Sequence, residues 1–258
     1  MPTDKFRHTL ILDVGLKTYG RDMIKDSTSE NAFLGEVATP RGDIPTGLEP
    51  VSLAHVSGST MSLAEVTFVV VDLETTGSVA SECGITEIGA VKVRFGEVLS
   101  DFRTFCNPGM PIPEYITQMT GITNGHVQTA PSADIAVQSF LDWAQLDASH
   151  DTVLVAHNAP FDISFLVHAC ATHGLSWPEP PILDTLRLAR KLLSRDEVTD
   201  KKLSTLAAHF DAPTTPTHRA LDDAMATVTV LHALLERVAG YGVEDPVTLL
   251  GYEWGKSR

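Results

Sequence analysis

The sequence has no long apolar run and little cysteine. Across its 258 residues, no apolar segment approaches the roughly 20 residues that a membrane-spanning helix needs. The three cysteines, Cys83, Cys106 and Cys170, are odd in number, scattered and without metal-ligand spacing, so we interpret them as reduced thiols. The N-terminus has no positive flank leading into an apolar region, as a signal peptide would. These absences predict a cytoplasmic protein without a membrane partner.

Positive charge is scarce as well. The chain has 19 Lys and Arg against 33 Asp and Glu, which gives a formal net charge of −14 at pH 7. Non-specific binding to duplex nucleic acid relies on basic contacts to phosphates, so this balance argues against it. However, carboxylates that bind divalent cations form a site that is locally less negative than its sequence suggests. A metal-dependent site for nucleic acid therefore remains compatible with the composition.

The first 60 residues show no periodic pattern. A strand-like run at 9–14 is followed by irregularly spaced Gly, Pro, Ser and Thr, which is typical of linker or weakly ordered chain. Either translation starts at Met61 or the segment is disordered, or it is a functional arm, and the sequence leaves these alternatives open. We expect an N-terminal extension over 1–60, one domain over 61–240 and a short C-terminal tail over 241–258.

Strand patterns alternate with helix patterns after residue 66. Gly96 and Glu97 are expected to form a two-residue turn between two strands. The expected strands lie at 68–71, 85–95, 98–105, 153–156 and 182–183. The expected helices lie at 114–125 (a short helix and turn), 132–145, about 159–173, 186–193, 203–210 and about 219–238. Ser132 is the expected N-cap of its helix, with Ile135, Phe140 and Trp143 as the apolar stripe. This order predicts an α/β domain with a mixed sheet.

Two acidic side chains stand at the end of the first strand. The β-branched run from Phe68 to Val71 predicts a central strand buried on both faces, and Asp72 and Glu74 follow it. Side chains two residues apart on a strand point to the same face, so both carboxylates enter one small volume. They repel each other there and resist desolvation unless cations compensate them. Taken alone, a strand that ends in an acidic turn would be the commoner explanation of this pair.

Further acidic residues lie at the ends of other expected elements. Asp162 lies on a helix that follows a strand, and Asp223 lies on the last long helix, five residues after His218. Hard oxygen ligands in this number suit Mg²⁺ or Mn²⁺ better than zinc. Two such ions about 3.5–4 Å apart can hold the attacking and leaving oxygens of a phosphodiester in line.

Three short segments now resemble a known family. They read Asp-Leu-Glu-Thr-Thr-Gly at 72–77, His-Asn-Ala-Pro-Phe-Asp at 157–162 and His-Arg-Ala-Leu-Asp-Asp-Ala at 218–224. These segments resemble the three motifs of the DEDDh 3′–5′ exonucleases, which include the epsilon proofreading subunit of bacterial DNA polymerase III. Residues 119–123 and 184–186 also fit the epsilon-like branch. The resemblance covers about 66–238, and three motifs in this order with the spaced histidine are specific.

The resemblance implies a ribonuclease H-like fold, a mixed β-sheet flanked by helices, and a mechanism with two Mg²⁺ or Mn²⁺ ions. Asp72 would bridge both ions, and Glu74, Asp162 and Asp223 would complete their shells. His218 would be the general base that activates water, a role that suits the unperturbed histidine pKa of about 6.5. The product would be a nucleoside 5′-monophosphate released from the 3′ end of single-stranded or frayed DNA.

The resemblance also implies contacts with the substrate. Backbone groups from Leu73 to Thr75 would hold the 3′-hydroxyl. Met119 and Phe161 match family positions that pack on the terminal nucleotide, although ordinary core packing is the alternative for both. Thr120 stands where the epsilon subunit has a histidine, which puts a polar contact there in doubt.

Other residues are expected to support the site without binding the ions. This group comprises His157, Asn158 and Asp184, of which Asp184 also fits the role of a helix cap. A basic cluster allows two interpretations, a solvated helix face or a contact for the phosphates of a single strand. Its members are Arg187, Arg190, Lys191, Arg195, Lys201 and Lys202.

Three alternatives remain open at the level of function. The substrate is DNA or, in the same superfamily, RNA and short oligonucleotides. A catalytically inactive nucleic-acid-binding module is disfavoured because all five motif residues are present. The chain is either a free-standing repair or turnover enzyme or the partner of a DNA polymerase subunit in proofreading.

Overall fold

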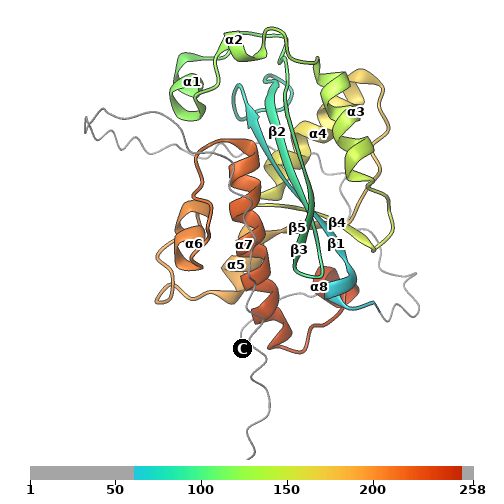
Figure 1. The fold of residues 1–258 in the computed structure, drawn as a ribbon, viewed down its shortest axis with the longest axis vertical. Coiled ribbons are helices and arrows are strands. Elements are labelled where there is room, and N and C mark those ends of the chain that lie inside the picture. Colours follow the sequence, from blue (N-terminus) through green and yellow to red (C-terminus); the bar gives the residue numbers. More distant parts are fainter. Residues whose placement is uncertain (1–60, 252–258) are drawn as a thin grey trace, which may run out of the picture. The chain divides into compact units, whose positions relative to one another are not determined.

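The computed structural model describes residues 61–251. The expected strand at 9–14, the rest of the N-terminal extension and the last seven residues of the tail lie outside this range. Within it, strands alternate with helices as the sequence predicts (Figure 1). No helix in this range has the length and apolar character required to cross a bilayer.

The sheet has five strands in the order β3-β2-β1-β4-β5. The central strand β1 (Thr67–Thr75) pairs antiparallel with β2 (Ile85–Arg94) and parallel with β4 (Thr152–Ala156). The strand β3 (Glu97–Phe105) extends one edge antiparallel to β2, and β5 (Ile182–Asp184) extends the other parallel to β4. The predicted mixed sheet is confirmed.

The turn between β2 and β3 lies one residue earlier than expected. Its two central residues are Phe95 (φ 54°) and Gly96 (φ 77°), and Arg94 pairs with Glu97. The prediction of Gly96 and Glu97 as the turn pair was therefore wrong. A two-residue hairpin of this kind needs positive φ at both central residues, and here a phenylalanine supplies the first.

Successive residues of β1 face opposite sides of the sheet, and both sides are covered (Figure 1). Phe68 and Val70 enter one core cluster, whereas Val69 and Val71 enter the other. The first cluster includes residues of α5 (Thr185–Leu192), α6 (Leu203–His209) and α7 (Ala220–Ala239), and the second includes residues of α3 (Ala133–Ala144) and α4 (Ala159–His173). Burial on both faces is what a continuous β-branched run in a central strand requires, so this prediction is confirmed.

The apolar stripe of α3 differs from the expected one. Ile135 is 55% exposed, whereas Phe140 is fully buried, together with Ala136 and Val137. Ile135 lies outside the buried stripe because the face that packs on the sheet is defined by the small residues beside Phe140. Ser132 occupies the N-cap position, but its hydroxyl makes no capping bond and instead contacts the Asp134 carboxylate.

The 114–125 region forms two helices, α1 (Glu114–Thr120) and α2 (Asn124–Val127), instead of one helix and a turn. Gly121, at φ 71°, ends the first of them. A positive φ at the residue after a helix is favourable for glycine because it has no Cβ.

The segment expected as a C-terminal tail begins as part of the packed domain. It contains α8 (Pro246–Gly251), whose Leu249 is 2% exposed and belongs to the core cluster of α7. Val243 is equally buried, and the Leu63 N–H donates to the Glu244 carbonyl at 2.8 Å. The expected boundary at residue 240 therefore does not coincide with the end of the core, because apolar residues beyond α7 return to it.

Candidate active site

The site is built at the end of β1. Asp72 lies opposite Gly89 of β2, and Glu74 lies opposite Glu87 in the same antiparallel pair. Asp72 is partly exposed, whereas Glu74 is only 6% exposed. The two carboxylates share a face of the sheet because they are two residues apart on one strand.

The first turn of α4 brings Asp162 to the same place. The Asp162 carboxylate accepts a hydrogen bond from the Leu73 N–H at 3.0 Å, between the two acidic residues of β1. Asp162 is buried, so this bond fixes a carboxylate in the protein interior. The strand-to-helix connection that follows β4 thus delivers the third acidic residue to the end of the neighbouring parallel strand.

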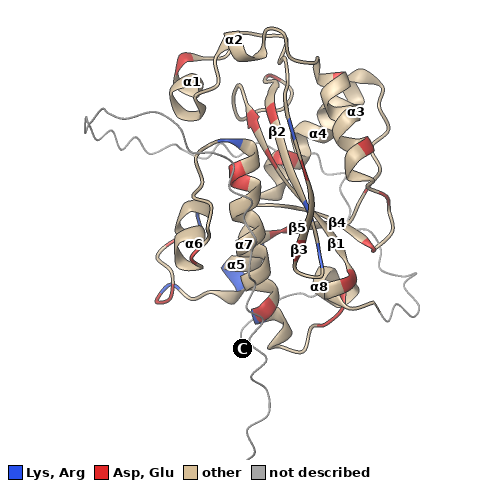
Figure 2. Ribbon diagram, viewed as in Figure 1, with Lys and Arg blue, Asp and Glu red and all other residues tan. Residues whose placement is uncertain are grey.

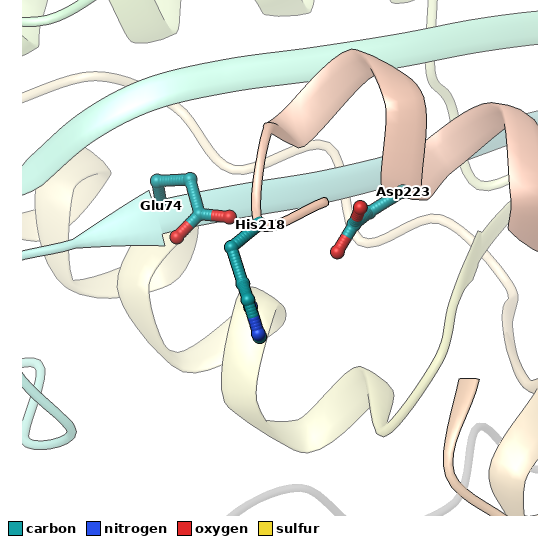
Figure 3. A group of neighbouring side chains, drawn as sticks. All are labelled: Glu74, His218 and Asp223. Carbon is teal, nitrogen blue, oxygen red and sulfur yellow. The ribbon is translucent and has the colours of Figure 1, made fainter. Parts of the chain in front are cut away.

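The start of α7 supplies the last two side chains. Asp223 accepts a hydrogen bond from the Thr217 N–H at 2.8 Å, which closes the loop around His218. His218 is exposed and has a left-handed backbone, with φ 56°. Glu74, His218 and Asp223 each offer one ligand atom, and these atoms lie within 4.8 Å of one another. Figure 3 shows the three side chains, with Glu74 at the end of its strand, His218 on the loop and Asp223 on the helix.

All four carboxyl groups have a raised pKa. Burial raises the pKa of Asp72 well above its usual value, and repulsion from Asp162, Asp223 and Glu74 adds to this. Burial and then repulsion from Asp223 and other carboxylates raise the pKa of Glu74 to about 8. Burial also raises the pKa of Asp162 to about 8, against the opposing hydrogen bond from the Leu73 N–H. For Asp223, burial outweighs the bond from Thr217 and raises the pKa.

This electrostatic pattern fits a divalent cation. Carboxylates that repel one another in a desolvated place need either protons or a cation to compensate them. Figure 2 shows acidic segments gathered at the end of β1 and in the first turn of α7. Oxygen donors in this number suit hard divalent ions. The described residues therefore provide a site that a divalent metal ion fits.

The predicted supporting residues lie around the start of α4. Asp184 accepts hydrogen bonds from the N–H groups of Asn158 and Leu186, at 3.0 and 2.9 Å. The His157 ring lies between the Thr185 hydroxyl and the Lys201 carbonyl, each at 2.9 Å. Because a carbonyl only accepts, Nε2 donates to it, and burial lowers the pKa of His157. These contacts hold the turn that precedes Asp162.

The predicted substrate residues separate into two groups. Met119 is 48% exposed, so it lies outside the core, and Phe161 is half-buried against Phe165 with ring centroids 5.1 Å apart. Thr120 is buried, and its hydroxyl donates to the Ile116 carbonyl at 3.0 Å. The helix thus turns this hydroxyl inward, and a contact between Thr120 and the substrate stays a prediction.

Two polar groups at 73–75, where we predicted backbone contacts with the 3′-hydroxyl, already have partners within the protein. The Leu73 N–H donates to Asp162, and the Thr75 hydroxyl donates to the Gly77 carbonyl at 2.6 Å.

The basic residues of α5 are exposed while Leu188 and Ala189 are buried. Figure 2 shows the basic segment of α5 away from the acidic first turn of α7.

One buried carboxylate next to the site was not singled out in the sequence. Glu87 is fully buried in β2 and accepts hydrogen bonds from Arg103, Arg219 and the Ala220 N–H. Burial raises its pKa, but these hydrogen bonds outweigh burial and hold the pKa below the usual value. A charged residue between Thr86 and Ile88, in the first half of a predicted strand, was the available signal.

Comparisons with known proteins agree with this geometry. A family model described as exonuclease matches residues 69–231. The chain is 48% identical over 219 residues to a putative bifunctional exonuclease/endonuclease protein of Mycobacterium tuberculosis, covering 80% of this chain and 33% of that protein. It is 39% identical over 190 residues to a PolC-type DNA polymerase III of Caldanaerobacter subterraneus, covering 74% of this chain and 13% of the polymerase. The chain thus spans a third or less of each of these relatives.

Solved structures share the fold. Exonuclease X in complex with 5′ overhanging duplex DNA superimposes with a TM-score of 0.54 at 23% identity, covering 71% of this chain and 99% of that one. E. coli exonuclease I in complex with a dA16 oligonucleotide gives a TM-score of 0.57 at 16% identity, covering 68% of this chain and 42% of that one. The family match and the M. tuberculosis relative show that the chain belongs to the DEDDh-type exonuclease family, and the solved structures show that it has the ribonuclease H-like fold.

Proposed function

We propose that this protein removes nucleotides one at a time from the 3′ end of single-stranded or frayed DNA and releases nucleoside 5′-monophosphates. The observation that carries the proposal is the convergence of Glu74, His218 and Asp223 within 4.8 Å. Asp162 joins them through its hydrogen bond to the Leu73 N–H, next to Asp72.

Asp72, Glu74, Asp162 and Asp223 would hold two divalent ions, Mg²⁺ or Mn²⁺. Such ions stabilise the attacking and leaving oxygens of a phosphodiester. The raised pKa values of Glu74 and Asp162, both about 8, support this assignment, because a cation would compensate the repulsion among these carboxylates. The protein itself contributes the fixed positions of the four carboxylates.

His218 would act as the general base. Its ring is exposed to solvent, where an attacking water has access, and it lies beside two of the proposed metal ligands. A neutral ring nitrogen takes the proton from water as the water attacks the last phosphodiester. The left-handed backbone at His218 and the hydrogen bond from Thr217 to Asp223 limit the orientations of this side chain.

Met119 and Phe161 would pack on the terminal nucleotide. Met119 is exposed on α1, and Phe161 lies one residue before Asp162. An exposed apolar side chain is suited to packing on the face of a base. The DNA named with exonuclease X and with exonuclease I supports a DNA substrate for this chain. The similarity to PolC-type polymerases supports proofreading, and repair as a free-standing enzyme is equally compatible.

The experiment is a digestion of matched DNA and RNA oligonucleotides with a label at the 5′ end. With Mg²⁺, we expect a ladder that shortens from the 3′ end of unpaired DNA, with mononucleotides carrying a 5′-phosphate as the product. A 3′-terminal phosphorothioate linkage should slow the first step. Shortening from the 5′ end would overturn the direction, and faster digestion of RNA would overturn the substrate. No cleavage with either Mg²⁺ or Mn²⁺ would leave a binding module.

A further inference from the structure

The Glu87 carboxylate uses both of its oxygens on the start of α7. Oε2 accepts hydrogen bonds from Arg219 Nε at 3.0 Å and from the Ala220 N–H at 3.2 Å. Oε1 accepts from Arg219 Nη2 at 2.9 Å and from Arg103 Nε at 2.8 Å. Two parallel bonds between a guanidinium group and a carboxylate fix direction as well as distance. Glu87 thus fixes both the side chain of Arg219 and the backbone of the next residue.

The backbone of α7 also touches β2 directly. A Cβ added at Gly89 would lie 2.2 Å from the Ala220 carbonyl carbon and from the Leu221 nitrogen. Only glycine allows this approach, since real Cβ atoms do not come so close to other backbone atoms. Gly89 and Glu87 are two residues apart on β2, so contact and hydrogen bonds act on the same face.

His218 lies between two fixed points. On its N-terminal side, the Thr217 N–H donates to Asp223 at 2.8 Å. On its C-terminal side, Arg219 is held by Glu87, and the Arg219 guanidinium carbon also lies 5.5 Å from the ring centroid of Phe105. His218 itself has a left-handed backbone. A displacement of Arg219 would rotate the neighbouring peptide and move the imidazole.

We propose that Glu87 is a positioning residue for hydrolysis: it holds Arg219 and Ala220 on β2 and so keeps His218 beside Glu74 and Asp223. Glu87 is paired with Glu74 across β1 and β2, but its carboxylate hydrogen-bonds to Arg103, Arg219 and the Ala220 N–H and acts through the α7 N-terminus. This inference rests on the proposed function, in which His218 is the general base.

The test measures kcat and KM on a labelled single-stranded oligonucleotide for the wild type, Glu87→Gln, Arg219→Lys and the double variant. Glu87→Gln keeps the shape of the side chain but replaces one accepting oxygen with a donor group that faces other donors. Arg219→Lys keeps the charge and loses the paired geometry. We expect each single variant to lower kcat by about 10- to 100-fold, as small misplacements of reacting groups do. KM should change by less than about threefold, because neither residue is placed on the substrate.

The double variant tests whether the two residues act together. Its kcat should be no lower than that of the less active single variant, because both changes release the same contact. Glu197→Gln is the matched control, since Glu197 pairs with Arg237 on the surface, and its kcat should equal the wild-type value. The values are normalised to folded enzyme by circular dichroism, which separates positioning from a loss of folded protein.

The outcomes distinguish the inference from the function on which it rests. A folded Glu87→Gln variant with kcat within about threefold of wild type, or fully additive losses in the double variant, would overturn the inference. If Glu87→Gln does not fold, Arg219→Lys decides, and a wild-type kcat there overturns it. His218→Ala is assayed beside them. If His218→Ala keeps the wild-type kcat, the proposed function fails, whatever is found at Glu87.

Discussion

Glu74 and Glu87 are direct partners across β1 and β2, yet their pKa values shift in opposite directions. Both side chains are almost completely buried, at 6% and 0% exposed. The pKa of Glu74 is raised to about 8 by burial and by the surrounding carboxylates. Burial likewise raises the pKa of Glu87, but the hydrogen bonds from Arg219, Arg103 and the Ala220 N–H outweigh it and lower the pKa.

The difference lies in the partners and not in the burial. The negative charge of Glu87 is balanced by arginine side chains and a backbone N–H of the protein itself, so it needs no ion from solution. Among residues 61–251, Glu74 has other carboxylates as its main neighbours, and its charge needs a compensating ion from solution. A buried charge that the fold compensates serves structure, whereas one that it leaves uncompensated is available for chemistry. The predictions below test this contrast.

The largest effect is expected at Asp72. Asp72→Asn removes one of the carboxylates that lie beside Glu74 and lack a cationic partner in the fold of residues 61–251. This change should lower kcat on the order of 10⁴-fold, since bound metal ions supply several kcal/mol of transition-state stabilisation. The measurement is mononucleotide release under saturating Mg²⁺. Asp101→Asn, the same change on the exposed edge strand β3, is the control and should leave kcat unchanged. Equal activity in both variants would show that the carboxylates at the end of β1 are not needed for hydrolysis.

A somewhat smaller effect is expected at His218. His218→Gln should lower kcat by roughly 10²- to 10⁴-fold, the range for loss of a general base. The Mg²⁺ concentration for half-maximal rate should change little, because four carboxylates remain. A parallel loss of Mg²⁺ affinity would instead make His218 a ligand, as its closeness to Glu74 and Asp223 also allows.

The sequence predicted the uncompensated side of this pair better than the compensated side. Asp72 and Glu74 lie in the last residues of β1, and Asp162 lies in the first turn of the helix after β4. The carboxyl ends of parallel strands meet at one edge of the sheet, so this convergence follows from topology. The partners of Glu87 lie 16 and 132 positions away in the chain. No local pattern connects residues at that separation, so the contact network of Glu87 becomes visible only in the fold.

Other errors have similar physical origins. The exposure of Ile135 depends on which face of α3 packs on the domain. The spacing of apolar residues predicts the buried face of a helix only when the helix is long enough to show its period. The burial of Leu249 depends on a return of the chain to the core after α7, which no spacing announces.

Metal binding should change stability in a pH-dependent way. Glu74 and Asp162 have raised pKa values of about 8 in the folded state, so the folded protein binds more protons than the unfolded chain between the unfolded pKa and about 8. Stability of the metal-free protein is therefore fully present below the unfolded pKa and decreases as pH rises through this range. In EDTA, we expect a lower Tm at pH 8 than at pH 6.

Added Mg²⁺ should reverse this trend. A ligand at about 100 times its Kd stabilises by about 2.7 kcal/mol, which corresponds to a rise in Tm of roughly 5–10 °C for a domain of this size. The rise should be larger at pH 8 than at pH 6, because protons compete with the ion at the lower pH. Asp72→Asn provides the control and should respond less to Mg²⁺. A Tm that changes with neither pH nor Mg²⁺ would contradict the conclusion that the charge of Glu74 lacks a compensating partner in the described part of the fold.

The smallest effect is expected on the compensated side, at Gly89. Gly89→Ala would place a Cβ 2.2 Å from the backbone of Ala220, so α7 must move away from β2 and from Glu87. Such overpacking costs about 1–3 kcal/mol, measurable as a lower midpoint of urea unfolding. Gly125→Ala is the matched control, since its Cβ would meet only the Thr123 hydroxyl at 3.5 Å. If both variants unfold at the wild-type midpoint, the close contact of α7 with β2 at Gly89 is refuted.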